Sequence, residues 1–452
     1  MVRKIVVIGS GAAGMTAAST ARRVDPQAEI TVLTEDEHIA YSPCVIPWVL
    51  EGLTDWDSII MHDSEYYRQE RGIEVLNLTK VSAVDSVAKT VTAGGKALPY
   101  DSLVLATGGT VFVPPIPGKD LGNVFVVRTI NDGKAIEAAL PSVEQVAVIG
   151  AGVIGLEIAL SLQKSGKQVT VVEMMDQVIP RIFDKDMADP VQNYLQSQGV
   201  RFLMGCPIRS VQGEGKAQAV QAGEETIPCQ MVIFATGVRA NLEIPRMMEL
   251  DIGSLGAVQT SPTMQPYRRG RLVPDVYLAG DVVQCQSAVA PGPTMSQLGS
   301  SAVRQGIVAG SNAAGSHATH GAVASPWVSV IGDLQVAGTG LSESLASWYG
   351  LKAVCGKAKG HSRARYYPGG SPYTVKILVD PSSRLIIGAQ MMAGEDLTGR
   401  INWLTAAITE RVCIDDLICR FENAYCPPTS MVRDVALAAA DDALQQLKRL
   451  TC

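Results

Sequence analysis

Two runs of aliphatic and β-branched residues, about 140 residues apart, mark places where the sequence predicts buried strands. They are KIVVIG at 4–9 and QVAVIG at 145–150. Continuous apolar runs without alternation are typical of strands that a parallel sheet buries on both faces. Each run leads through a glycine-rich turn into a stretch of helical character, MTAASTARRV after the first and LEIALSLQKSG after the second. The chain therefore repeats one strand–turn–helix unit.

The remaining pattern predicts an α/β fold followed by a different domain. Three more apolar runs end in turns, at 100–108, 231–237 and 275–281. Their alternation with helical stretches predicts one sheet interrupted by a second, inserted α/β unit, which the proline-rich segment 113–118 introduces. From about residue 325, strand-like runs precede a helical stretch at 401–412 without a third glycine turn. We expect a separate α+β domain there.

Both repeated turns have the spacing Gly-x-Gly-x-x-Gly. The first glycine permits a tight turn, the second lets a pyrophosphate approach the backbone, and the third lets the helix pack closely on the strand. The N–H groups at the start of the helix then face the phosphates. Two copies in this context predict two dinucleotide sites. We call them the first cradle, Gly9, Gly11 and Gly14, and the second cradle, Gly150, Gly152 and Gly155.

Carboxylates near the end of the next strand complete each cradle. Glu173 lies 18 residues after Gly155, where it is expected to accept hydrogen bonds from a ribose and to repel a 2′-phosphate. Methionines rather than an arginine follow it, so NADH is favoured over NADPH. Glu35, 21 residues after Gly14, is the corresponding candidate for the first cradle.

Length and charge limit the possible partners. A chain of 452 residues suggests two to four domains. A net charge of -6 without a basic block argues against nucleic acid or an anionic membrane. No apolar stretch is long enough to span a bilayer, and the N-terminus lacks the pattern of a signal peptide. We therefore expect a cytoplasmic protein.

The nine cysteines show neither a CxxC pair nor the spacing of a zinc site. The sequence thus predicts no metal site and no disulfide framework. Most of the cysteines are expected to be small buried hydrophobic residues.

The two cradles, the turns at Thr107-Gly108 and Gly237, and the segment that ends in Asp281 resemble the FAD- and NAD(P)H-dependent pyridine nucleotide–disulfide oxidoreductases along the whole chain. The resemblance implies an FAD-binding domain at 1–115 and 250–324, an NAD-binding domain at 116–249 and a dimerisation domain at 325–452. It places FAD on the first cradle, with Asp281 at the ribityl chain, and NADH on the second.

Shorter motifs resemble the branch of coenzyme A disulfide reductases and NADH oxidases, which use one cysteine. The loop YSPCVIPW contains Cys44, and the tyrosine motifs contain Tyr367 and Tyr425. In that family the second tyrosine motif reaches the active site from the partner subunit of a homodimer, and coenzyme A binds on the first helix. The matching residues on that helix are Thr16, Thr20 and Arg23.

Four features depart from the family pattern. Trp48 and the following residue leave no CxxxxC pair, and Ala12 replaces the histidine of NADH peroxidases and water-forming oxidases. Thr34 stands where the family places its FAD ribose glutamate, so Glu35 is expected to substitute. Cys426 replaces the usual alanine or serine after Tyr425.

These features predict NADH-dependent reduction of a disulfide, persulfide or polysulfide, with coenzyme A derivatives favoured, through FAD and Cys44. The cysteine must act as a thiolate to attack sulfur. Tyr425, and after it Tyr367, is the candidate to protonate or position the leaving thiol. Cys426 of the partner subunit is a candidate to resolve the mixed disulfide, the alternative being a small buried residue. An NADH oxidase that reduces oxygen and an electron-transfer subunit for a protein partner remain the alternatives.

Overall fold

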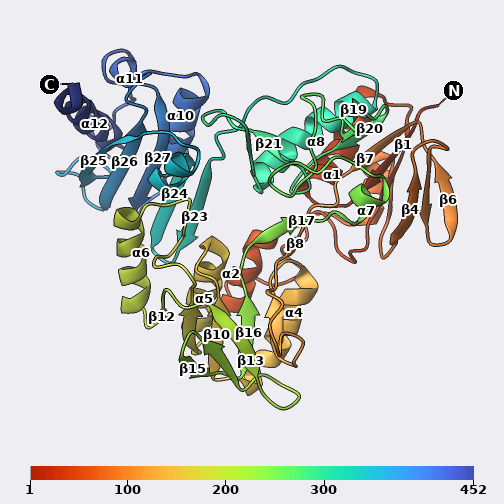
Figure 1. The fold of residues 1–452 in the computed structure, drawn as a ribbon, viewed down its shortest axis with the longest axis horizontal. Coiled ribbons are helices and arrows are strands. Elements are labelled where there is room, and N and C mark those ends of the chain that lie inside the picture. Colours follow the sequence, from red (N-terminus) through yellow and green to blue (C-terminus); the bar gives the residue numbers. More distant parts are fainter. Residues whose placement is uncertain (1, 452) are drawn as a thin grey trace.

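The computed structural model describes residues 2–451 as three lobes (Figure 1). Two lobes are built on five-stranded parallel sheets, and the third on a five-stranded antiparallel sheet. The predicted α/β architecture, with two Rossmann-like units and a C-terminal α+β domain, is thus present. We call the lobes the first unit, the second unit and the C-terminal unit.

The first unit has the strand order β20-β7-β1-β2-β3. Two helices, α1 and α8, pack against each other closely because glycines lie at their contact. A Cβ on Gly306 or Gly310 of α8 would lie 2.5 or 2.2 Å from a backbone oxygen of α1. The antiparallel sheet β4-β5-β6 extends this unit. The elements are β1 (Lys4–Ile8), α1 (Ala12–Val24), β2 (Glu29–Leu33), α3 (Ser64–Arg71), β3 (Ile73–Leu76), β4 (Val81–Asp85), β5 (Thr90–Ala93), β6 (Lys96–Pro99), β7 (Ser102–Leu105), β20 (Val276–Leu278) and α8 (Gly299–Ala313).

The second unit repeats this plan with the strand order β12-β11-β10-β16-β9 and the small sheet β13-β14-β15. One of its helices, α2 (Ile46–Glu51), comes from the sequence of the first unit: Ile46 and Leu50 are buried in the second core. The other elements are β9 (Val124–Val126), α4 (Ile130–Ala139), β10 (Gln145–Ile149), α5 (Val153–Lys164), β11 (Gln168–Val172), α6 (Lys185–Ser197), β12 (Arg201–Leu203), β13 (Ile208–Gln212), β14 (Ala219–Ala222), β15 (Glu225–Pro228) and β16 (Met231–Phe234).

A two-stranded ribbon of β8 (Gly109–Val111) and β17 (Val238–Ala240) connects the first and second units. The next helix, α7 (Glu243–Met247), contributes Ile244 to the core of the first unit. The chain is therefore back in the first core before the predicted domain boundary at residue 249.

The C-terminal unit has the strand order β23-β24-β27-β26-β25, and one edge strand, β23, lies against α5 of the second unit. Gly356 on β25 lets α12 pack directly on the sheet, since a Cβ there would lie 2.0 Å from the Ala439 oxygen. No helix in the described chain is long and apolar enough to cross a membrane. The elements are β23 (Trp327–Ile331), β24 (Leu334–Gly340), α9 (Glu343–Trp348), β25 (Val354–His361), β26 (Pro372–Val379), β27 (Ile386–Ala393), α10 (Thr398–Thr409), α11 (Ile414–Arg420) and α12 (Val435–Thr451).

Candidate active site

One continuous cavity of about 1940 Å³ is lined by residues of all three units and contains most of the predicted site residues of the first and second units. Its wall includes residues of both cradles, of the helix α1 and of the loop that contains Cys44. A space of this size at the carboxyl ends of parallel strands fits extended ligands such as dinucleotides. The predicted residues that line it are Gly9, Gly11, Thr16, Thr20, Arg23, Glu35, Cys44, Thr107, Gly108, Gly152, Gly237 and Asp281.

The glycines of the first cradle have the geometry that their spacing predicts. Gly9 has a φ of +107°, and a Cβ there would lie 2.2 Å from the Ala106 oxygen. A Cβ on Gly14 would lie 1.9 Å from the Gly9 oxygen, so helix and turn touch. A Cβ on Gly11 would meet nothing within 4 Å and would project into free space. The cradle therefore leaves room where a pyrophosphate is expected.

The second cradle repeats this geometry and adds a bound carboxylate. Gly150 has a φ of +108°, and a Cβ on Gly155 would lie 2.1 Å from the Gly150 oxygen. Glu173 is 7% exposed, and its carboxylate accepts hydrogen bonds from the backbone N–H groups of Ala151 (2.8 Å) and Met175 (2.9 Å). Glu173 therefore holds the cradle itself, while each oxygen keeps a further lone pair for a ribose.

Comparison of the two cradles places Thr34, rather than Glu35, in the position equivalent to Glu173. Each cradle's first glycine donates to the last residue of its neighbouring strand, Gly9 to the Leu33 oxygen and Gly150 to the Val172 oxygen, both at 2.8 Å. Thr34 is buried and accepts a hydrogen bond from the Ser10 hydroxyl. Glu35 is an exposed residue at the cavity wall. To bind a ribose on the first cradle, the Glu35 side chain would therefore have to extend from one residue further along the chain than Glu173 does on the second cradle.

Cys44 is exposed at the cavity wall, in a one-turn 3-10 helix, Pro43–Val45, that leads into α2. Because α2 is anchored in the second unit, the thiol lies at the junction of two units. Glu51 at the end of α2 pairs with Lys164 of α5 at 2.8 Å, which reinforces this attachment. A thiol exposed to a cavity can react with a bound sulfur compound, whereas a buried thiol cannot.

Asp281 carries a partner that the sequence did not reveal. The Arg128 guanidinium reaches it from the segment between β9 and α4, with Nη2 2.8 Å from Oδ2. The Asp132 carboxylate holds the backbone N–H groups of Arg128 and Thr129 in a capping box at the start of α4. Arg128 also lines the cavity and is therefore a candidate ligand for a phosphate. A single arginine after a short strand gives no sequence signal of this kind.

Glu157, on α5, is the second cavity residue that sequence reasoning missed. Burial raises the pKa of its carboxyl to about 7, against the opposing effect of a 2.6 Å hydrogen bond from the Ser329 hydroxyl. Ser329 belongs to β23 of the C-terminal unit. A charged residue within the apolar helix sequence VIGLEIALSL was the available signal.

Tyr367 and Tyr425 are not among the residues that line the cavity of their own chain. The Tyr425 hydroxyl is hydrogen-bonded to that of Tyr366, not Tyr367, and this bond raises the pKa of Tyr425. Cys426 is exposed in the single chain. Within one subunit, it is therefore not the small buried residue of the alternative interpretation. Its neighbours Tyr367 and Tyr425 are exposed as well.

The expectation that most cysteines are buried is wrong. Among the eight described cysteines, only Cys229 and Cys285 are buried, and burial raises their pKa values to about 12 and about 11. Cys206, Cys355 and Cys413 are half-buried, and the others are exposed. Two of the half-buried cysteines, Cys206 and Cys355, still pack against the edges of apolar clusters. Cys452 lies outside the described residues.

Two family models together match most of the chain. The pyridine nucleotide-disulphide oxidoreductase model matches residues 3–306, and the dimerisation domain of the same family matches residues 326–434. The second match supports the predicted homodimer.

Individual relatives and a solved structure match nearly the whole of this chain. An "NADH oxidase" of Methanocaldococcus jannaschii is 42% identical, over 98% of this chain and 99% of its own. An "NAD(P)H coenzyme A polysulfide/persulfide reductase" of Pyrococcus horikoshii is 32% identical, over 97% and 98%. The structure of an NAD-dependent persulfide reductase from A. fulgidus has a TM-score of 0.94 at 32% identity and covers 99% of this chain, which covers 84% of that one.

Proposed function

This chain belongs to the pyridine nucleotide-disulphide oxidoreductase family, and we propose that it uses NADH to reduce a disulfide, persulfide or polysulfide at Cys44. Its general activity is that of a flavoprotein oxidoreductase with FAD and NADH as cofactors. The observation that carries the sulfur substrate is the exposed Cys44 thiol in the wall of the cavity that both cradles share.

Coenzyme A derivatives are the substrates that we favour. The persulfide reductase of Pyrococcus horikoshii is named for coenzyme A, and Thr16, Thr20 and Arg23 line the same cavity as Cys44. An arginine at the mouth of a cavity can pair with the phosphates of such a substrate.

In the proposed reaction, the Cys44 thiolate attacks one sulfur of the substrate and forms a mixed disulfide, while the other sulfur leaves as a thiol. When bound on the first cradle, FAD would carry the two electrons of the NADH hydride to the mixed disulfide, whose S–S bond then breaks to release the second thiol and return Cys44 as a thiolate. The overall balance is RSSR + NADH + H⁺ → 2 RSH + NAD⁺. A tyrosine hydroxyl of the partner subunit protonates the leaving sulfur. Tyr425 is the preferred candidate, and Tyr367 is the next.

Reduction of oxygen is the second candidate function, because the relative from Methanocaldococcus jannaschii is named NADH oxidase and covers nearly the whole chain. Ala12 favours the sulfur substrate, since it stands where the resemblance places the histidine of water-forming oxidases. The third candidate function is transfer of electrons to a protein partner. In that case, turnover would require the partner to be present.

Cys44→Ser tests the proposal. The variant is expected to retain FAD and to be reduced by NADH in anaerobic stopped-flow measurements, because the hydride step does not need the thiol. Its turnover with coenzyme A disulfide or persulfide is expected to fall below a few percent of the wild-type value. Cys419→Ser, at another exposed thiol, is the matched control. Full disulfide turnover in Cys44→Ser, or oxygen consumption that exceeds disulfide reduction in the wild type, would refute the proposal.

A further inference from the structure

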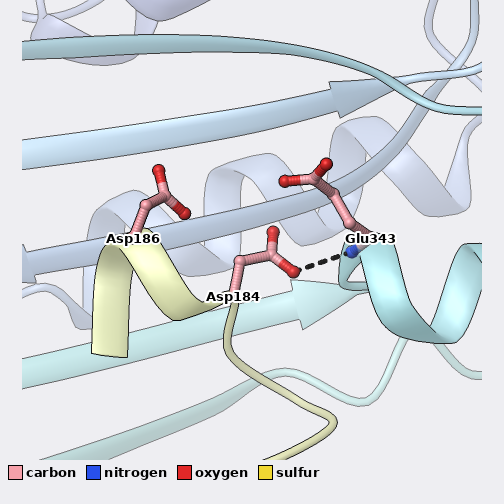
Figure 2. A group of neighbouring side chains, drawn as sticks. All are labelled: Asp184, Asp186 and Glu343. Atoms are coloured by element: carbon pink, nitrogen blue, oxygen red, sulfur yellow. Dashed lines mark hydrogen bonds between the residues drawn. The ribbon is translucent and has the colours of Figure 1, made fainter. Parts of the chain in front are cut away.

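A lysine with three carboxylates joins the second unit to the C-terminal unit. Asp184 and Asp186 come from the start of α6, and Glu343 comes from α9; Figure 2 shows their carboxylates converging. One oxygen from each lies within 4.8 Å of the others, a spacing that suits a cation. The Lys376 ammonium occupies that place: its Nζ lies 3.1 Å from Asp184 and 2.8 Å from Asp186, and it also contacts Glu343. The protein thus supplies its own cation.

This cluster, which we call the lysine clasp, is buried at Lys376 and Asp184, whereas the side chains of Asp186 and Glu343 are 45% and 54% exposed. The side chains of Lys376 and Asp184 are 5% and 7% exposed. Burial opposes the charges, but the hydrogen bonds from Lys357 and Lys376 outweigh it for Asp186, whose pKa is lowered. A buried lysine remains charged only with good partners, and removal of one member of such a set leaves uncompensated charge.

The clasp grips one end of the segment 173–184, which connects β11 to α6 and which we call the nucleotide-side loop. Asp184 accepts a hydrogen bond from the Glu343 backbone N–H at 2.9 Å, drawn as the dashed line in Figure 2. The Gln390 amide on β27 bonds both the backbone N–H (2.9 Å) and the carboxylate (2.8 Å) of Asp184. The Ser344 hydroxyl donates to the Arg181 oxygen at 3.2 Å.

The other end of the same loop shapes the second cradle. Glu173 binds the Ala151 N–H, and the Ile179 N–H donates to the Ala151 oxygen at 2.8 Å. Ala151 lies between two cradle glycines, so the loop holds the cradle backbone from both sides. Ile179 and Arg181 have φ values of +47° and +72°. Such conformations are costly for a β-branched residue and persist where the surroundings enforce them.

We propose that Lys376 is a positioning residue for nicotinamide nucleotide binding. The clasp fixes the strained loop to the C-terminal unit, and the loop holds Ala151 and Glu173 in the geometry that receives the nucleotide. The affinity of the second cradle therefore depends on the unit that matches the family's dimerisation domain. The inference rests on the assignment of the second cradle to NADH, and not on the sulfur substrate.

The test is Lys376→Ala, measured as the Kd of NAD⁺ for the oxidised, FAD-loaded dimer by titration calorimetry with a chelator present. We expect a Kd raised on the order of tenfold, the scale of coupling through packed networks. FAD content and the rate of flavin reduction at saturating NADH are expected to stay near wild type. Arg201→Ala, which removes an exposed ion pair with Glu225 inside the second unit, is the control and is expected to leave the Kd unchanged.

Rescue by a cation distinguishes positioning by charge from general loss of packing. Without the ammonium, the three carboxylates suit Ca²⁺, whose oxygen ligands lie at about 2.3–2.6 Å. Millimolar CaCl₂ is expected to restore NAD⁺ affinity in Lys376→Ala and to leave the wild type unchanged. A folded Lys376→Ala with wild-type Kd would overturn the proposal, as would a raised Kd that Ca²⁺ leaves untouched.

If Lys376→Ala does not fold, Glu343→Gln carries the test, because the Glu343 side chain is 54% exposed and its removal leaves two carboxylates for Lys376. We expect faster amide hydrogen exchange within 176–184 and a two- to threefold rise in the Kd of NAD⁺. Unchanged exchange and affinity in this variant would overturn the proposal. Since these measurements use no sulfur substrate, their failure differs from failure of the proposed function, which Cys44→Ser tests.

Discussion

At the residue scale, burial rather than ion pairing determines the behaviour of Glu157. No cation in the described chain forms a salt bridge with it, and its hydrogen bond comes from the neutral hydroxyl of Ser329. Lys164, the next charged residue along α5, pairs instead with Glu51 of α2. The Glu157 carboxyl therefore changes its ionisation near neutral pH, at the wall of the cavity.

The raised pKa of Glu157 predicts a pH-dependent stability. Between the ordinary value of 4.5 and about 7, the unfolded chain loses this proton while the folded chain keeps it, so stability falls as pH rises through that window. Glu157→Gln removes the penalty and is expected to stabilise the protein at pH 8 by on the order of 3 kcal/mol. The gain is expected to vanish near pH 4.5. Thermal unfolding at both pH values measures it, and an equal difference at the two values would contradict the assignment.

We expect Glu173, which holds the second cradle, to determine the choice between NADH and NADPH. Glu173→Gln keeps an acceptor for the cradle but removes the charge. We expect NADH affinity to fall by about 1–3 kcal/mol, the range for a hydrogen bond to a charged group, and the preference over NADPH to narrow. Steady-state KM values for the two nucleotides measure this, with Glu225→Gln as an exposed control in the same unit. A wild-type preference for NADPH would refute the role.

At the element scale, the helices α1 and α5 begin at equivalent glycine turns whose positions differ in what surrounds them. A methyl group on Gly14 would collide with the backbone of Gly9, whereas one on Gly11 would project into the space that the cradle leaves. Packing and ligand binding are therefore separable within one turn.

This difference predicts opposite phenotypes for two alanine substitutions. Gly11→Ala is expected to fold with nearly unchanged stability as an apoprotein, because its methyl group fills the place of the FAD pyrophosphate. Gly14→Ala is expected to be destabilised by several kcal/mol, as overpacking against backbone requires helix and strand to separate. FAD absorbance after purification and the midpoint of chemical unfolding distinguish the two. Retention of FAD by Gly11→Ala would contradict the assignment of the first cradle.

At the scale of the whole molecule, the site is complete only when several units contribute. Cys44 belongs to the sequence of the first unit, but the helix that follows it is buried in the second. Ser329 comes from the C-terminal unit, and the lysine clasp joins that unit to the second. The tyrosine motifs and Cys426 are exposed outside their own cavity. Exposure of these motifs on a unit that matches a dimerisation domain agrees with their use by a partner subunit.

Cys426 provides the prediction for the dimer. If it approaches Cys44 of the partner subunit to within about 7 Å between Cα atoms, the two thiols can form a disulfide. Mild oxidation is then expected to produce a crosslinked dimer on non-reducing gels, and Cys426→Ala is expected to lose it. Disulfide turnover in that variant is expected to slow with flavin reduction by NADH unchanged. Cys419→Ala is the control, and a crosslink that survives in Cys426→Ala would contradict the pairing.

The sequence by itself determined the features that are local along the chain. The two strand–turn–helix repeats, the roles of Gly9 and Gly14, the change of architecture near residue 325 and the cysteine loop all follow from short segments, because turn geometry and strand burial depend on neighbouring residues. Only the tertiary structure decided the features that join distant segments: α2 in the core of the second unit, Arg128 at Asp281, Tyr366 rather than Tyr367 at Tyr425, and Lys376 among three carboxylates up to 192 residues away in the chain. The sequence positions of charged and polar side chains show no periodicity from which their partners could be predicted. Their pairing depends on how the packed units bring their surfaces together.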